Sequence, residues 1–214
     1  MTPTFNPFDR PYWEDRYSSP GFTWSGNPNA VLVAEVTPLA PGRALDVGSG
    51  EGGDALWLAS RGWQVTGVDI ATAALDKARA HAESVNPAAA ARIRWEQHDI
   101  TDWSPEPQSF DLVSAQFMQL AEPARSVLFR TLAAAVAPGG TLLIVGHDAV
   151  GVEFDEPRAH MRDLMFTAED VVAAIADELT VETAESRARQ LDGAHEHGPM
   201  PNDVVVRATR PRAT

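Results

Sequence analysis

A glycine-rich loop flanked by acidic residues is the first feature of the sequence that indicates chemistry. Asp46 precedes Gly48, Ser49 and Gly50, and Asp69 follows further along the chain. Glycines let a backbone pass close to a ligand and adopt positive φ without a Cβ clash. A carboxylate placed like Asp69, at the end of the next strand, can accept hydrogen bonds from both ribose hydroxyls of an adenosine. The pattern therefore predicts a nucleoside-containing ligand.

Two cofactors are compatible with this loop. Gly48-x-Gly50-x-x-Gly53 matches the dinucleotide fingerprint, so an NAD-dependent oxidoreductase is one interpretation. Asp46 can instead bind the cationic amino end of the methionine moiety of S-adenosylmethionine. Asp46 and Glu51 would repel a pyrophosphate, and the loop has no Arg or Lys to compensate. The charges favour S-adenosylmethionine.

A second acidic position follows the third expected strand. Asp99 can accept a hydrogen bond from the exocyclic amine of adenine, while Ile100 packs beside the ring. Ile70, next to Asp69, is assigned to the same cofactor site. The alternative for Asp99 is a structural one, in which its carboxylate caps the turn before Thr101.

The elements that must position these residues alternate between strands and helices. Such alternation indicates βαβ units, and apolar strands such as Thr141–Val145 fit a sheet that is covered on both faces. We therefore expect a doubly wound α/β fold with a mostly parallel seven-stranded sheet. The expected strands are 43–47, 63–70, 93–98, 110–115, 141–145, 179–185 and 203–208, and the expected helices are 10–18, 28–37, 53–61, 71–84, 123–136 and 168–177.

The order of the motifs resembles the class I S-adenosylmethionine-dependent methyltransferases. The segments that carry the resemblance are LDVGSGEG (45–52), GVDI (67–70), QHDI (97–100), FDLVSA (110–115) and APGGTLLIV (137–145). The resemblance implies a Rossmann-like methyltransferase fold, S-adenosylmethionine as cofactor, and Ala115 beside the cofactor. It also implies a single domain over residues 1–214, with an N-terminal helical and aromatic segment (1–41), a cofactor-binding core (42–148) and an acceptor-side insert with the last two strands (149–214).

The N-terminal block is similar to that of the thiopurine, thiol/halide and tellurite methyltransferase group. The similarity rests on Tyr12-Trp13-Glu14-x-x-Tyr17 and Phe22-Thr23-Trp24-x-Gly26-x-Pro28. It implies that this segment folds over the cofactor, with Trp24 at the cofactor, Tyr17 on the substrate side and Trp13 as a packing anchor.

Candidates for the acceptor side follow the fourth and fifth strands. Gln116 follows the fourth, and His147 and Asp148 follow the fifth. His147 is the candidate general base, which an acceptor needs only if it carries a proton. Neighbouring residues of an extended segment point in opposite directions, so His147 and Asp148 need not touch. His195 and His197 are interpreted as a solvated loop, and no metal site is expected.

Composition limits the partners and the compartment. With 17 basic and 30 acidic residues the net charge is −13, which argues against binding to nucleic acid or anionic lipid. The absence of cysteine excludes disulfides and thiolate nucleophiles. No export signal or membrane-spanning run is visible, so we expect a cytoplasmic monomer or homodimer.

The sequence thus predicts a methyltransferase that acts on a small-molecule acceptor by in-line methyl transfer. The acceptor atom is left open among oxygen, nitrogen, sulfur and an inorganic ion. The alternatives are an NAD-dependent oxidoreductase, an aminopropyl transferase and a non-catalytic cofactor-binding module.

Overall fold

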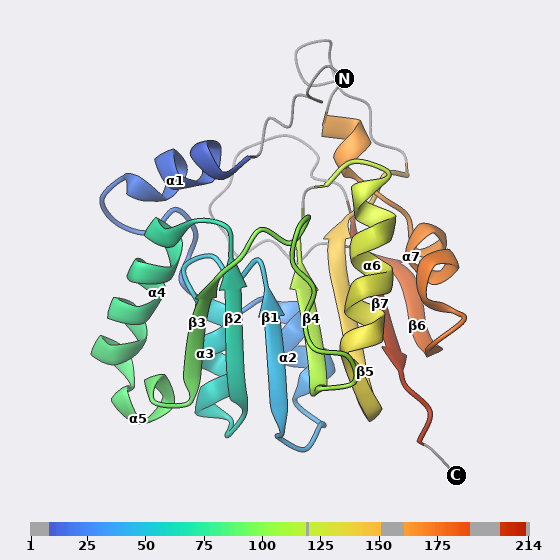
Figure 1. Cartoon of the computed structure of the whole chain (residues 1–214), viewed down its shortest axis with the longest axis horizontal. Coiled ribbons are helices and arrows are strands. Elements are labelled where there is room, and N and C mark those ends of the chain that lie inside the picture. Colours follow the sequence, from blue (N-terminus) through green and yellow to red (C-terminus); the bar gives the residue numbers. More distant parts are fainter. Residues whose placement is uncertain (1–8, 119, 151–160, 189–201, 213–214) are drawn as a thin grey trace. The chain divides into compact units, whose positions relative to one another are not determined.

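The computed structural model describes residues 9–118, 120–150, 161–188 and 202–212 (Figure 1). Seven strands form one sheet in the order β3-β2-β1-β4-β5-β7-β6. The sheet is mixed and mostly parallel with helices flanking it, which confirms the α/β fold expected from the sequence. Contacts divide the chain into two compact units, residues 1–103 and 104–214.

The first unit carries three parallel strands and most of the helices. Strand β1 pairs with β2 and β2 pairs with β3, so the carboxyl ends of all three lie at one edge. The expected elements lie within two residues of the observed ones, and only the short α5 was not expected. The elements are α1 (Arg10–Ser18), α2 (Ala30–Val36), β1 (Arg43–Val47), α3 (Gly53–Ser60), β2 (Gln64–Asp69), α4 (Thr72–Val85), α5 (Pro87–Ala90) and β3 (Ile93–Gln97).

Helix α4 packs closely on the strands because its buried face is rich in alanine. Its own N-cap, Ala71, offers no side-chain acceptor. Glu14 of α1 supplies the cap instead, and its carboxylate accepts the N–H groups of Thr72 at 2.9 Å and Ala73 at 3.0 Å. The N-terminal helix is thereby tied to the start of α4.

Close packing in the first unit also depends on one glycine within a strand. A Cβ on Gly67 of β2 would lie 2.7 Å from the ring of Trp95 on β3. Glycine at this position lets the indole lie flat across β2. The Trp95 ring in turn reaches the loop that follows β1, where a Cβ on Gly52 would lie 2.7 Å from it.

The second unit combines a parallel pair with an antiparallel ending. Strand β4 pairs with β5 in parallel, whereas β7 pairs antiparallel with both β5 and β6. In Figure 1, α6 is drawn in front of β5, and the helix contacts both β4 and β5. The elements are β4 (Phe110–Gln116), α6 (Ala124–Ala135), β5 (Val136–His147), α7 (Ala168–Ile175), β6 (Thr180–Arg187) and β7 (Asp203–Thr209).

Strand β5 corrects one prediction from the sequence. It begins at Val136, where a helix was expected to end, and not at Thr141. Gly139 and Gly140 form hydrogen bonds with the segment that follows β7. Gly139 donates to the carbonyl of Arg210 at 2.8 Å, and Arg210 donates to the carbonyl of Gly140 at 3.0 Å. This pairing lengthens the strand.

A buried arginine holds the turn before α7. Arg125 of α6 is 7% exposed and donates to the carbonyls of Asp163 and Met165, both at 2.9 Å. Helix α7 begins with a capping box of Thr167 and Asp170, a pattern that can be read from the sequence. Within the described ranges, none of the helices is long and apolar enough to cross a membrane.

Candidate cofactor site and acceptor-side residues

The loop after β1, residues 48–53, is called the glycine loop below. Gly48, Gly50 and Gly52 adopt positive φ of 70°, 50° and 82°. Gly48 and Ser49 both donate backbone hydrogen bonds to the carbonyl of Val68, at 2.8 and 2.9 Å. These left-handed conformations explain why glycine occupies the loop, and they bring its backbone over the end of β2.

Asp69, the last residue of β2, joins its strand to the glycine loop. Its Oδ2 accepts the N–H of Gly50 at 2.8 Å, and its Oδ1 accepts the N–H of Ala71 at 2.9 Å. Burial raises the pKa of this carboxyl above its usual range, although the backbone hydrogen bonds offset part of the effect. Each oxygen keeps a second lone pair, so the carboxylate can also accept hydroxyl donors from a ligand.

Asp46 of β1 is the clearest sign of a missing cationic partner. It is 2% exposed, and its Oδ2 has no hydrogen-bond partner among the residues the structure describes. The N–H of Ala55 donates to the carboxylate. Burial, followed by the charges of Asp54 and Asp69, raises the pKa of Asp46 well above its usual range.

The residues of this site therefore fit S-adenosylmethionine on electrostatic grounds. A buried carboxylate without a partner is costly, and two neighbouring carboxylates increase that cost. An ammonium group would donate to Asp46 Oδ2 and offset the shared negative charge. The anionic pyrophosphate of a dinucleotide would add to that charge. The geometry therefore supports the part of the sequence argument that rests on Asp46, whereas Lys77 offsets the charge of Glu51.

Asp99 caps the turn before Thr101, which is the structural alternative that the sequence left open for it. Its Oδ1 accepts both the N–H of Thr101 at 2.9 Å and the hydroxyl of Thr101 at 2.6 Å, which caps the turn. Asp99, Ile70 and Ile100 are all half-buried. Beside them His98 stacks on Trp103 with ring centroids 4.4 Å apart. The capping role occupies only one oxygen of Asp99.

The N-terminal helix places Tyr17 against the glycine loop. Tyr17 is 5% exposed, and its hydroxyl lies 3.1 Å from the position that a Cβ on Gly50 would take. The indole N–H of Trp24 donates to that hydroxyl at 3.1 Å, and Trp13 stacks on the Tyr17 ring. Burial raises the pKa of the Tyr17 phenol, which stays a neutral hydroxyl. Trp24 is 51% exposed and lies under the guanidinium of Arg16.

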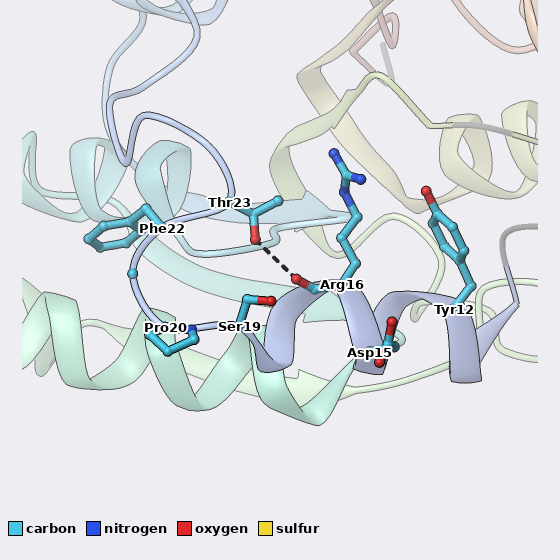
Figure 2. A pocket seen from close by; sticks show the side chains of 8 residues that line it. Tyr12, Asp15, Arg16, Ser19, Pro20, Phe22 and Thr23 are labelled. Carbon is cyan, nitrogen blue, oxygen red and sulfur yellow. Dashed lines mark hydrogen bonds between the residues drawn. The ribbon is translucent and has the colours of Figure 1, made fainter.

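Figure 2 shows a hollow of about 390 Å³ on this N-terminal segment, beside α1. The side chains of Tyr12, Asp15 and Arg16 extend from the helix, and the hydroxyl of Thr23 donates to the carbonyl of Arg16 at 3.4 Å. The sequence did not predict this hollow, because its shape depends on the path of the loop that follows α1. The lining residues are Tyr12, Asp15, Arg16, Ser19, Pro20, Gly21, Phe22 and Thr23.

The end of β4 holds side chains that face one another. Ala115 is buried in the strand. The Gln116 amide N–H donates to the Ser114 hydroxyl at 2.8 Å, and its buried Oε1 accepts from no donor within the described part of the chain. Phe117 has a positive φ of 53°, unusual for a residue with a Cβ, and its ring centroid lies 4.8 Å from that of His147.

His147 and Asp148 separate at the end of β5. The Asp148 carboxylate is almost fully buried and accepts the N–H of Val150, two residues later, at 2.9 Å. His147 faces Asp203 of β7, with Nδ1 and Oδ1 4.0 Å apart. Sequence reasoning missed Asp203, because only the antiparallel register of β5 and β7 brings the two side chains opposite each other.

No set of three His, Cys, Asp or Glu side chains in the described ranges is arranged to hold a metal ion. His195 and His197, interpreted from the sequence as a solvated loop, lie outside the described residues.

Comparison with known proteins supports the same interpretation. Residues 44–140 match a family model described as a methyltransferase domain, and this range includes the glycine loop, Asp69 and Asp99. Residues 44–140 thus match a methyltransferase domain, and this match together with the relatives supports placing the chain among the class I S-adenosylmethionine-dependent methyltransferases.

Relatives of this methyltransferase domain differ in what their names say they act on. Trans-aconitate 2-methyltransferase of Sinorhizobium medicae is 33% identical over 133 residues, which cover 61% of this chain and 46% of that protein. The tRNA 5-carboxymethoxyuridine methyltransferase of Escherichia coli K12 is 33% identical over 122 residues, covering 56% and 46% of the two chains. The chain spans about half the length of the curated relatives it matches.

Solved structures agree with the fold of the methyltransferase domain. An S-adenosylmethionine-dependent methyltransferase from Mesorhizobium loti superposes with a TM-score of 0.67 at 20% identity, covering 84% of this chain and 96% of that one.

Proposed function

We propose that the whole chain acts as one S-adenosylmethionine-dependent methyltransferase whose acceptor is a small molecule. The observation that carries the proposal is Asp46, a buried carboxylate whose Oδ2 has no protein donor within the described residues and which lies among further carboxylates. That environment favours a cationic ligand over an anionic one.

The residues divide the binding task among themselves. We assign the ribose hydroxyls to Asp69, the ammonium group to Asp46, and adenine to Asp99, Ile70 and Ile100. The backbone of Gly48, Ser49 and Gly50 lines the ligand and Trp24 bounds the site, while Ala115 is assigned to the cofactor from the resemblance. Tyr17 has a hydroxyl hydrogen to donate, since its oxygen is the acceptor in the hydrogen bond from Trp24.

When bound, S-adenosylmethionine supplies an electrophilic methyl group on a sulfonium. The chain must hold the acceptor in line with that methyl, and such alignment can contribute roughly 7–11 kcal/mol to lowering the barrier. We propose His147 as the group that receives the acceptor's proton, with Gln116 and Asp148 on the acceptor side. Asp203 would keep His147 oriented and stabilise its protonated form.

Three features bear on the class of acceptor. Trans-aconitate, the compound in the name of several relatives, is a small carboxylic acid. The N-terminal motifs resemble the thiopurine, thiol/halide and tellurite group, which keeps soft nucleophiles among the candidates. The net charge of −13 disfavours a tRNA acceptor despite the relative that is named for one, because phosphate binding requires basic surface.

The test is a calorimetric titration of the purified protein with S-adenosylhomocysteine, alongside NAD and NADP. Micromolar binding of S-adenosylhomocysteine alone is expected. Binding of NAD instead would overturn the proposal, and so would the absence of binding by all three.

An acceptor screen with radiolabelled methyl then separates the classes. Trans-aconitate and other carboxylic acids, phenols, thiols, halides, tellurite and bulk tRNA form its arms. Transfer to a small molecule supports the proposal, and transfer to tRNA alone contradicts it.

A further inference from the structure

A buried ion pair ties the loop after α1 to the glycine loop. Residues 19–24 are called the N-terminal loop here. Glu51 lies in the glycine loop and is 3% exposed. Lys77, the chain's only lysine, lies on α4, with its Nζ 3.3 Å from Glu51 Oε1.

Both charged groups bind the backbone of the N-terminal loop. The Glu51 carboxylate accepts the N–H of Thr23 at 2.8 and 2.9 Å and the N–H of Trp24 at 3.0 Å. Lys77 Nζ donates to the carbonyls of Ser19 at 2.7 Å and Gly21 at 2.6 Å. With the bond to Glu51, these use all three donors of the ammonium.

This arrangement makes the pair specific for one path of the loop. Lys77 needs carbonyls from its first half, and Glu51 needs N–H groups from its second half. If the loop moved away, a carboxylate and an ammonium would each lose hydrogen bonds in a poorly solvated place, which is costly. The loop in turn orients Trp24, whose indole N–H holds the Tyr17 hydroxyl beside Gly50.

We propose that Glu51 and Lys77 are positioning residues for cofactor binding: through the N-terminal loop they hold Trp24 and Tyr17 against the glycine loop. The inference rests on the proposed function, because it assumes that this loop binds S-adenosylmethionine. Neither residue needs to touch the cofactor. The same pair shapes the hollow of Figure 2, whose wall includes Ser19 to Thr23.

Binding measurements on matched variants test the proposal. We expect Lys77→Met and Glu51→Gln to raise the dissociation constant for S-adenosylhomocysteine at least tenfold. Lys77→Arg, which keeps a cation with several donors, is expected to restore most of the affinity. Arg79→Met is the control, because Arg79 lies on the same helix and pairs with the exposed Asp76.

A chemical probe tests the same point in the unaltered protein. Lys77 is the only lysine, so an amine-reactive ester modifies it and the chain's N-terminal amine, and peptide mass spectrometry separates the two products. All three N–H donors of its Nζ are bound to Ser19, Gly21 and Glu51, so reaction requires the loop to release the amine. Saturating S-adenosylhomocysteine is expected to slow acylation of Lys77 at least fivefold and to leave the N-terminal amine unchanged.

The outcomes distinguish failure of the positioning role from failure of the proposed methyltransferase function. If the unaltered protein does not bind S-adenosylhomocysteine, the proposed function fails and the positioning role fails with it. If the unaltered protein binds but Lys77→Met binds equally well, or if the ligand does not protect Lys77, only the positioning role is overturned. Thermal unfolding of each variant shows whether lost binding reflects lost folding, and the acylation result stands without any variant.

Discussion

The glycine loop and the ends of β4 and β5 organise polar side chains in different ways. Around the glycine loop, Glu51, Asp54 and Asp69 all accept hydrogen bonds from backbone N–H groups. At the ends of β4 and β5, side chains face other side chains: His147 faces Asp203, and Gln116 donates to Ser114. Backbone partners remain when neighbouring side chains change, whereas side-chain partners change with every substitution. The first arrangement suits a cofactor common to a family, and the second suits an acceptor that differs between members.

The largest effect is expected at His147. If His147 receives the acceptor's proton, His147→Ala lowers kcat about 10²-fold or more, in the range typical of general base catalysis. Its affinity for S-adenosylhomocysteine is expected to stay within twofold, by calorimetry. Asp203→Asn is expected to reduce kcat less, because it removes only the orienting charge. An unaltered rate in His147→Ala would mean that the acceptor needs no base. The side-chain pairs at the ends of β4 and β5 would then have no catalytic role to set them apart from the glycine loop.

Asp69→Ala tests the backbone-anchored region. The substitution leaves the N–H groups of Gly50 and Ala71 without their acceptor, and each such loss costs about 1–3 kcal/mol. We expect lower stability in urea and at least tenfold weaker binding of S-adenosylhomocysteine. Asp69→Asn, which keeps one acceptor oxygen, is expected to lie between Asp69→Ala and the unaltered protein. If Asp69→Ala binds S-adenosylhomocysteine with normal affinity, Asp69 does not bind the ribose hydroxyls.

The buried carboxylates predict a pH dependence. Burial raises the pKa of Asp54 from 3.8 to about 6, and burial with neighbouring charges raises that of Asp46. Because the folded state holds these protons more tightly than the unfolded one, their contribution to stability falls as pH rises, and for Asp54 the loss runs from about pH 4 through about pH 6.

Affinity for S-adenosylmethionine is expected to rise over the same range, since the ionised carboxylates attract its positive charge. Titrations between pH 4.5 and 7.5 measure this, with Asp46→Asn as the comparison that flattens the slope. Equal slopes in the two proteins would exclude Asp46 as the group that binds the cation.

The smallest effects concern the attachment of α1. Glu14→Gln weakens the cap that α1 supplies to α4 and is expected to cost about 1 kcal/mol of unfolding free energy. Burial alone would raise the Glu14 pKa, but the N–H groups of Ala73 and Thr72 and the nearby Arg10 hold it below its usual value. The stabilisation is therefore present near neutral pH and is lost as pH falls through that lowered value.

Arg10→Ala serves as the matched control, because its pair with Glu14 is exposed and is expected to contribute less than about 0.5 kcal/mol. Urea unfolding of the two variants compares them. A larger loss from Arg10→Ala than from Glu14→Gln would show that the ion pair, and not the cap, holds α1.

Sequence alone determined the elements whose signals are local. The glycine loop, the strands on either side of it and the capping box of α7 follow from residues a few positions apart, because turns and caps are short-range geometry. The charge argument for S-adenosylmethionine also needed only Asp46 and Glu51 near one another in the chain. The start of β5 could not be predicted in this way, because it depends on hydrogen bonds between Gly139, Gly140 and Arg210, about seventy residues later in the chain.

Only the tertiary structure decided which distant residues meet. Glu51 was interpreted from its charge near a ligand, yet its carboxylate binds the N-terminal loop and the lysine of α4. Asp203 became a partner for His147 through the register of β5 and β7, and Asp148, the neighbour in sequence, turned away. The physical reason is the same in both cases: a side chain pairs with whatever the packed chain places within about 3–4 Å, and sequence distance does not limit that choice.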